Sequence, residues 1–297
     1  MAGRARTVLL TFGVILGIFL VFFTAVLALL AYLEGGEILS FPGERIALVE
    51  VEGIILDADD VVRQLKEHLE NSAVKAVVVR INSPGGVVAP TQEIYDALGR
   101  LRDEGKPVVA SLGSVAASGG YYIASAADQI VANPGTLTGS IGVIMHLTNL
   151  EGLLKKVGLR YEIVKSGKYK DIGSFSRPMT NEERAILQSL MDDVHDQFVE
   201  AVANGRGLDR TVVLSLADGR IFSGRQAKEL NLVDELGGRE EAIQAAASLA
   251  GITGKPKLLF PRRRFSITDW VQERFGGRSF LFPASLPPFK TPLYLMD

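Results

Sequence analysis

The sequence predicts an α/β fold built on a mostly parallel β-sheet. Short runs rich in β-branched residues, such as residues 46–51 and 74–81, alternate with stretches that have the apolar spacing of a helix, such as residues 91–103. Clusters of turn-forming residues separate these runs. Strands and helices that alternate at this spacing are typical of a sheet whose neighbouring strands run in the same direction.

Composition narrows the class of protein. The chain has 297 residues, of which 47% are hydrophobic, so a large core is possible. Its formal net charge is −2, and no basic excess or aromatic–basic interleaving indicates nucleic-acid binding. The absence of cysteine excludes disulfides, thiol catalysis and Cys-ligated metals. His68, His146 and His195 lie far apart in the sequence, so we expect no histidine-rich metal site.

The first apolar run is long enough to cross a membrane. Residues 7–33 contain no charged side chain, and roughly 20 apolar residues span a bilayer as a helix. A cleaved signal peptide would have a shorter apolar region and a small-x-small site, which this run does not give cleanly. Arg4 and Arg6 precede the run, so we expect residues 1–6 in the cytoplasm, residues 7–33 as a single transmembrane anchor, and the rest on the extracytoplasmic side.

A polar connector at residues 34–44 leads into a domain that we place at residues 45–252. We expect its first half to contain strands at residues 46–51, 74–81 and 107–112 and helices at residues 57–69, 91–103 and 123–127. In its second half we expect strands at residues 130–132, 141–145 and 161–164, with short strands within residues 219–224 and 232–238. We also expect a helix from Asn149 to about residue 157 and a long amphipathic helix from Asn181 to about residue 203. Two further helices are expected to end at residues 230 and 249.

Residues 253–297 form a C-terminal extension. Its tail is apolar and interrupted by proline, so we expect neither a helix nor a second membrane span there. An apolar tail of this kind should be buried, and we expect it to dock in or near the groove of a neighbouring subunit.

Ser118 lies in a turn of small residues, GSVAASGGYY, between a predicted strand and a predicted helix. Its hydroxyl would lie beside the first unpaired N–H groups of that helix, an environment that suits an oxyanion or a phosphate. The two glycines that follow allow another chain to approach closely. The alternative is a small-residue turn that serves only packing.

A serine nucleophile needs a base and donors for the oxyanion. The N–H of Gly119 directly follows the serine, and Gly86 offers a second N–H from the loop after the neighbouring strand, at the sheet edge where sites form. Two bases are possible from the residues alone. His146 could act with Asp171 or Asp128 as its acid, or Lys170 could act if its pKa is depressed enough to leave the amine neutral.

Five segments of the chain occur in the order found in one known family. They are the loop from Asn82 to Gly86, the turn around Ser118, GTLTGSIGV at residues 135–143, SGKYKD at residues 166–171, and residues 219–224. Together they resemble the bacterial signal peptide peptidases of the SppA type, in their short, single-unit form, over residues 45–249. The resemblance implies a Clp-protease/crotonase-like α/β fold of repeated β-β-α units, with residues 45–252 as the peptidase domain.

The resemblance also implies a site. Carried over by position, Ser118 is the nucleophile, Lys170 the general base, and Ser140 the residue that orients the lysine. The N–H groups of Gly86 and Gly119 form the oxyanion hole. No metal and no organic cofactor is implied, and His146 falls a few residues beyond the histidine of the Clp branch.

The function implied is a membrane-anchored serine endopeptidase of the bacterial inner membrane. Its substrates would be residual signal peptides or other unfolded apolar peptides on the extracytoplasmic side. The family assembles into a ring, for which an octamer is expected, and lysine and serine can come from neighbouring subunits. Two other classes stay open, namely an acyl-CoA enzyme on the same scaffold and an inactive scaffold that binds peptides.

Overall fold

The computed structural model describes residues 13–26, 44–260 and 293–295. The chain divides into two units, Met1–Gly43 and Glu44–Asp297. In the first unit, residues 13–26 form a helix. Within the described ranges no helix is both long and apolar enough to cross a bilayer, and the two ends of the predicted anchor, residues 7–12 and 27–33, lie outside them.

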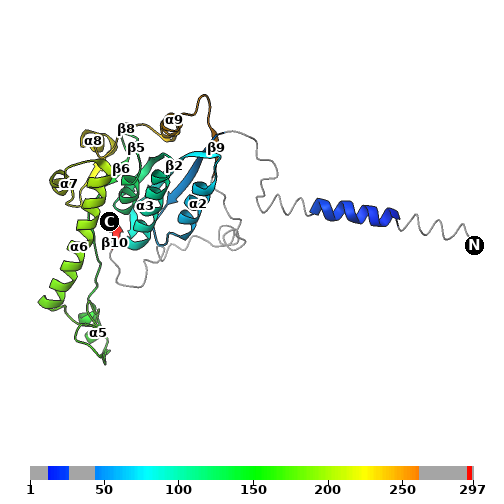
Figure 1. Ribbon diagram of the computed structural model, residues 1–297. Coiled ribbons are helices and arrows are strands. Elements are labelled where there is room, and N and C mark those ends of the chain that lie inside the picture. The colour runs from blue at the N-terminus through cyan, green and yellow to red at the C-terminus, as the bar shows by residue number, and fades with distance from the viewer. Residues whose placement is uncertain (1–12, 27–43, 261–292, 296–297) are drawn as a thin grey trace, which may run out of the picture. The chain divides into compact units, whose positions relative to one another are not determined.

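The second unit is built on an eight-stranded sheet (Figure 1). All of its strand pairs are parallel except the pair of β6 and β7, so the prediction of a mostly parallel sheet is confirmed. The strand order is β7 (Ile221–Ser223), β6 (Leu137–Gly139), β4 (Val108–Ala117), β2 (Val74–Ser83), β1 (Arg45–Glu52) and β9 (Lys257–Leu259), while β5 (Gln129–Ala132) pairs with β4 and with β8 (Glu235–Leu236).

Both faces of this sheet are buried, because side chains alternate along each strand. In β1, Ala47 and Val49 pack in the larger core, whereas Ile46 and Leu48 pack in a smaller core on the other face. The larger core is covered by α2 (Asp59–Glu70), α3 (Val88–Asp103), α4 (Gly119–Ser125) and α6 (Asn181–Arg206), and the smaller by α9 (Arg239–Leu249). The short helices α7 (Arg210–Leu216) and α8 (Gly224–Glu229) complete this part of the chain.

Strand β4 pairs with different strands along its length. Residues 109–112 pair with β5, and residues 115–117 pair with β6. The strand therefore ends where the sheet forks, and its last residue, Ala117, lies opposite Gly139 of β6. This fork places the turn at Ser118 beside the turn that follows β6.

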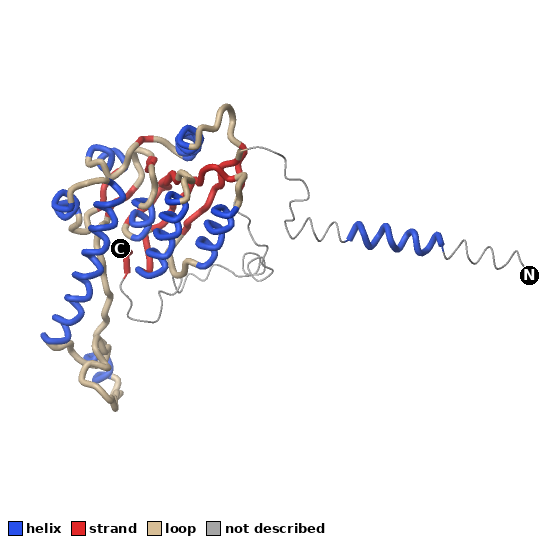
Figure 2. Tube along the Cα trace, in the orientation of Figure 1, coloured by secondary structure: helices blue, strands red, loops and turns tan. Residues whose placement is uncertain are grey.

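Residues 142–180 form an arm that extends from the sheet domain along the first half of α6 (Figures 1 and 2). The predicted strands at residues 141–145 and 161–164 are wrong: apart from an isolated bridge residue at Ile144, these segments are loop. A β-branched run becomes a strand only beside a partner, and these segments have none within the described sheets. Arm residues such as Val157 and Val164 are instead exposed.

The helix within the arm and the helix that follows it begin nearly as predicted. The Asn149 side chain accepts a hydrogen bond from the N–H of Glu151 at the start of α5 (Glu151–Lys156). The N-cap of α6 is Thr180, one residue before the predicted Asn181, because Thr180 forms a capping box with Glu183.

A second, two-stranded sheet was not predicted. Strand β10 (Leu293–Leu295) pairs antiparallel with β3 (Gly85–Val87), which lies in the loop after β2. The described end of the C-terminal extension thus packs on its own chain, whereas its docking on a neighbouring subunit stays a prediction.

Candidate active site

Ser118 lies at a sharp turn between β4 and α4. Its backbone has φ 51° and ψ −117°, a conformation that side-chain-bearing residues rarely adopt and that costs about 1–3 kcal/mol. The turn is held by hydrogen bonds from the N–H of Ser118 to the carbonyl of Gly139 and from the N–H of Tyr122 to the carbonyl of Ser118, each 2.8 Å long. Ser118 is fully buried, and its Oγ has no hydrogen-bond partner in the described chain. The fold therefore fixes the backbone of this turn and leaves the serine hydroxyl unpaired within the described chain.

Ser140 lies beside Ser118, as the next residue after the paired Gly139. It has the same unusual φ of 51°, and its N–H donates to the carbonyl of Arg220 at 2.9 Å. The structure thus brings together Ser118 and Ser140, which are 22 positions apart in the sequence.

The loop after β2 packs closely against the start of α4. Gly85 has φ 106°, and a Cβ added to it would lie 2.7 Å from the N of Gly119. A Cβ on Gly86 would lie 2.1 Å from the carbonyl oxygen of Ile55. Both positions therefore require glycine. Gly86 and Gly119 come from the two elements expected to supply the oxyanion hole, and the direction of their N–H groups toward a substrate stays a prediction.

Strand β10 lies against this loop and close to the start of α4. Tyr294 is the register partner of Gly86, and its carbonyl oxygen would lie 1.8 Å from a Cβ on Gly85 and 3.1 Å from one on Gly119. An extended segment of the chain itself therefore presents a peptide carbonyl between the glycine loop and the residue after Ser118.

The Tyr294 side chain fills an aromatic pocket. It is fully buried, its ring centroid lies 5.1 Å from that of Tyr122 and 4.7 Å from that of Phe198, and its hydroxyl donates to the carbonyl of Val194 at 3.0 Å. Burial raises the pKa of Tyr122 to about 12 and also raises the pKa of Tyr294, so both phenols are neutral near pH 7. The pocket suits a large aromatic side chain with a polar end.

Lys170 lies on the arm and is exposed. Its neighbour Tyr169 bonds to Glu182 at the start of α6, whereas Tyr122, close to Ser118, packs on Phe198 in the second half of α6. These two positions on α6 are separated by about 24 Å of helix at 1.5 Å per residue. The structure of one chain therefore does not bring Lys170 to Ser118.

The alternative site, in which His146 is the base, has neither of its expected carboxylates available, because both Asp128 and Asp171 are paired elsewhere. Asp128 bonds to Arg102 and to the N–H of Val108 at the start of β4, about 30 Å of strand away from Ser118 at its end. Asp171 bonds to Lys165 and Arg177 on the arm. His146 is exposed at the base of the arm and makes no hydrogen bond with the Ser118 hydroxyl, which has no partner in the described residues.

A hollow of about 750 Å³ opens beside Ser140. Its lining includes Gln188, Asp192, His195, Asp218 and Arg220. His195 is not the purely solvated residue that its acidic neighbours suggest, because its Nε2 lies 2.8 Å from the carbonyl oxygen of Ala217. Two of the five motif segments, residues 135–143 and 219–224, form part of its wall, but no sequence pattern indicated that they meet α6 there.

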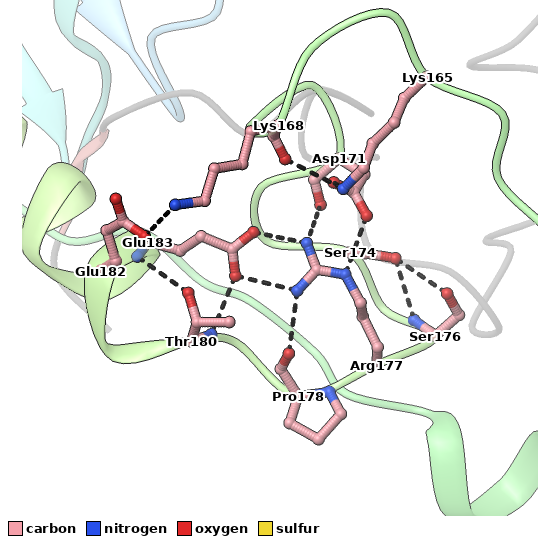
Figure 3. A network of polar contacts seen from close by, with 10 residues as sticks. All are labelled: Lys165, Lys168, Asp171, Ser174, Ser176, Arg177, Pro178, Thr180, Glu182 and Glu183. Atoms are coloured by element: carbon pink, nitrogen blue, oxygen red, sulfur yellow. Dashed lines mark hydrogen bonds and ion pairs between the residues drawn. The ribbon is translucent and has the colours of Figure 1, made fainter.

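Ion pairs surround the turn that carries Lys170 (Figure 3). Arg177 contacts both Asp171 and Glu183, Lys165 contacts Asp171, and Lys168 contacts Glu182. Sequence reasoning missed Arg177 and Glu183, because single charged residues in a polar segment resemble any solvated surface.

The strained serine turn, the adjoining glycine loop and the extended strand beside them are features expected of a serine peptidase. Comparison with known proteins agrees. Residues 100–253 match peptidase family S49, and residues 44–136 match the Clp protease family. The chain belongs to peptidase family S49, whose members are serine peptidases, and the prediction of a protease is confirmed.

Individual relatives carry protease names. A protein of Synechocystis sp. named as a protease is 52% identical over 211 residues, which cover 70% of this chain and 76% of the relative. A protein of Enterococcus faecium named as signal peptide peptidase SppA is 37% identical, covering 68% of this chain and 62% of the relative. Protease 4 of Haemophilus influenzae is also 37% identical, covering 69% of this chain but 35% of that longer relative.

Proposed function

We propose that this chain is a membrane-anchored endopeptidase that uses a Ser118–Lys170 dyad to hydrolyse residual signal peptides or other unfolded apolar peptides outside the cytoplasm. The observation that carries the proposal is the buried, unpartnered Ser118 hydroxyl at a strained turn beside a groove that holds an extended peptide segment. The apolar run at residues 7–33 supports the anchor, and Arg4 and Arg6 before it support an extracytoplasmic site.

The chemistry proceeds in two steps. Ser118 Oγ attacks the carbonyl carbon of the scissile bond while the neutral amine of Lys170 accepts its proton. The N–H groups of Gly86 and Gly119 stabilise the oxyanion, and the leaving amine takes the proton from Lys170. Water, deprotonated by Lys170, then hydrolyses the acyl-enzyme and frees Ser118. Ser140 accepts a hydrogen bond from Lys170 and orients it.

Substrate binding follows the mode of β10. A peptide lies extended along β3 with a carbonyl between Gly85 and Gly119, in the place that Tyr294 occupies. Only unfolded segments can bind in this way, because the strand edge needs a free peptide backbone. Signal peptides suit this groove since they are apolar, and the relatives named for this activity support that substrate class.

The active form is an assembly. Because Lys170 lies near the opposite end of α6 from Ser118, we propose that the arm of one copy delivers Lys170 to Ser118 of the next copy in a closed ring. The exposed apolar side chains of the arm, such as Leu153 and Leu159, support burial against another copy. The hollow beside Ser140 lies where such an arm would have to enter.

Hydrolysis of an apolar reporter peptide by four purified full-length proteins tests the dyad. Wild type cleaves the peptide, and Ser118→Ala and Lys170→Ala each lower kcat by at least about 1,000-fold. His146→Ala is the matched control and keeps nearly full activity, because the proposed dyad gives His146 no part in the proton transfer.

Two results would count against this function. Full activity of Lys170→Ala together with loss in His146→Ala would replace the dyad with a Ser-His pair. If a serine-reactive probe fails to label Ser118 in the folded protein, the peptidase chemistry is not at this residue, and the acyl-CoA enzyme or the inactive scaffold becomes the better description.

A further inference from the structure

Arg177 ties the Lys170 turn to the start of α6. Its Nε donates to Oδ2 of Asp171 at 2.8 Å, its Nη1 donates to Oε2 of Glu183 at 2.9 Å, and its Nη2 donates to Oε1 of Glu183. The two carboxylates are nearly buried, with 8% and 4% of their side chains exposed. A guanidinium that bridges two nearly buried carboxylates, one of them bidentate, fixes geometry as well as charge.

The turn is anchored on both sides of Lys170. Before it, Lys168 pairs with Glu182, and the Tyr169 hydroxyl donates to the same carboxylate (Figure 3 draws the Lys168 pair). After it, Asp171 accepts bonds from Lys165 and Arg177. The backbone closes the turn through the N–H of Lys170, which donates to the carbonyl of Gly167 at 3.2 Å. Lys170 is thus the exposed residue between two anchored neighbours.

The far end of this network is itself fixed. Glu183 accepts a hydrogen bond from the N–H of Thr180, and the Thr180 hydroxyl accepts one from the N–H of Glu183. Arg177 therefore connects the Lys170 turn to a capped helix end and not to a free surface side chain.

In this network, the carboxylates that anchor the Lys170 turn are all paired with cations other than Lys170. Hydrogen bonds from Arg177 and Lys165 hold the pKa of Asp171 well below its usual range, and the hydrogen bond from Arg177 is the main cause that lowers the pKa of Glu183 to about 2. Glu182 is likewise paired with Lys168. A carboxylate that paired with Lys170 would raise its pKa and keep it protonated, which is the wrong state for a base.

We propose that Arg177 is a positioning residue for Lys170: it holds the turn that presents the lysine and keeps Asp171 and Glu183 from pairing with it. This inference rests on the proposed function, in which Lys170 is the base. A purely structural role would predict a different outcome, namely a less stable arm with unaltered chemistry at the sites that remain assembled.

The test compares full-length Arg177→Gln with Arg184→Gln, which removes the same charge from an exposed position at the start of α6. We expect Arg177→Gln to lower kcat about 10- to 100-fold with little change in KM, because the lysine is misplaced while the peptide groove is intact. Arg184→Gln is expected to keep wild-type kcat. Oligomer size and circular dichroism are measured for each protein, so that loss of assembly is recognised.

The pH profile separates positioning from stability. In Arg177→Gln, the Asp171 carboxylate next to Lys170 loses one of its two cationic partners and keeps Lys165, while Lys168, Glu182 and Glu183 also face the turn. We expect the acidic limb of kcat/KM to move up by about one pH unit, because a carboxylate that has lost the Arg177 guanidinium is less neutralised and favours the protonated lysine. The double variant Arg177→Gln/Asp171→Asn removes that carboxylate and should return the limb to its wild-type position.

Defined results would overturn the inference. Wild-type kcat and pH profile in folded, assembled Arg177→Gln would do so, while an inactive Lys170→Ala would leave the proposed function standing. If Arg177→Gln does not fold, Asp171→Asn alone decides, since it keeps the Arg177–Glu183 pair and is expected to lower kcat about 10-fold. Wild-type kcat in that variant would also overturn it. Full activity in Lys170→Ala would instead refute the dyad.

Discussion

At the scale of single residues, the site depends on backbone positions that tolerate few side chains. Ser118 and Ser140 both have φ of 51°, and Gly85 has φ of 106°. Such strain persists only where surrounding hydrogen bonds enforce it, and both serine turns are held by backbone bonds to neighbouring segments. The backbone around Ser118, the proposed nucleophile, is therefore set without a side-chain partner for its hydroxyl.

Gly85→Ala tests this dependence. The added Cβ would meet the carbonyl oxygen of Tyr294 and the N of Gly119, and φ is unfavourable for alanine, so we expect loss of most peptidase activity. Gly99→Ala is the matched control, because a Cβ there meets nothing within 4 Å inside helix α3. It should keep activity and raise the free energy of unfolding by about 0.5–1 kcal/mol. Normal turnover in Gly85→Ala would show that this loop does not border the substrate.

Some features of single residues could be predicted from the sequence, and others could not. Ser118 was predicted from a small-residue turn after an apolar strand, and the structure confirms that turn. Arg177 was not predicted, because its role depends on Asp171 and Glu183 converging from six residues away on either side. Side-chain convergence of this kind has no periodic signal in a sequence.

At the scale of elements, β10 is a segment of the chain that occupies the groove proposed for substrate. Its pairing with β3 and the buried ring of Tyr294 compete with an added peptide for the same edge and the same pocket. A protein whose binding-competent state is only partly populated binds its ligand correspondingly less well.

Tyr294→Ala should therefore raise kcat/KM for an external apolar peptide, by about threefold or more. Tyr294→Phe is the control: it keeps the ring between Tyr122 and Phe198 and loses only the hydrogen bond to Val194, so we expect a much smaller change. Initial rates at low peptide concentration measure both variants. If folded Tyr294→Ala works no faster than wild type, β10 does not obstruct the groove.

The elements also show where sequence patterns fail. The β-branched segment at residues 161–164 was predicted as a strand, yet it lies in the arm without a partner in the described sheets. Strand β10 was missed because three residues near a Pro-rich stretch carry no alternation long enough to recognise. Long helices and buried strands, such as α6 and β2, were predicted to within a few residues, since their apolar pattern is set by burial.

At the scale of the whole molecule, the central feature is the distance between the proposed nucleophile and the proposed base. Ser118 belongs to the sheet domain near the second half of α6, and Lys170 belongs to the arm at its start. The mostly parallel sheet followed from alternating strands and helices, but no pattern in a single sequence reveals that the two proposed site residues lie near opposite ends of one helix. Sharing the dyad between copies reconciles this distance with a Ser-Lys mechanism.

Mixing two inactive variants tests directly whether Ser118 and Lys170 of one site come from different copies of the chain. Full-length Ser118→Ala and Lys170→Ala are combined one to one, dissociated and reassembled, and peptide hydrolysis is compared with each protein alone. If each site takes serine from one copy and lysine from the next, random assembly restores about a quarter of wild-type activity. If the mixture stays as inactive as its components while wild type treated in the same way recovers, the dyad is not shared between copies.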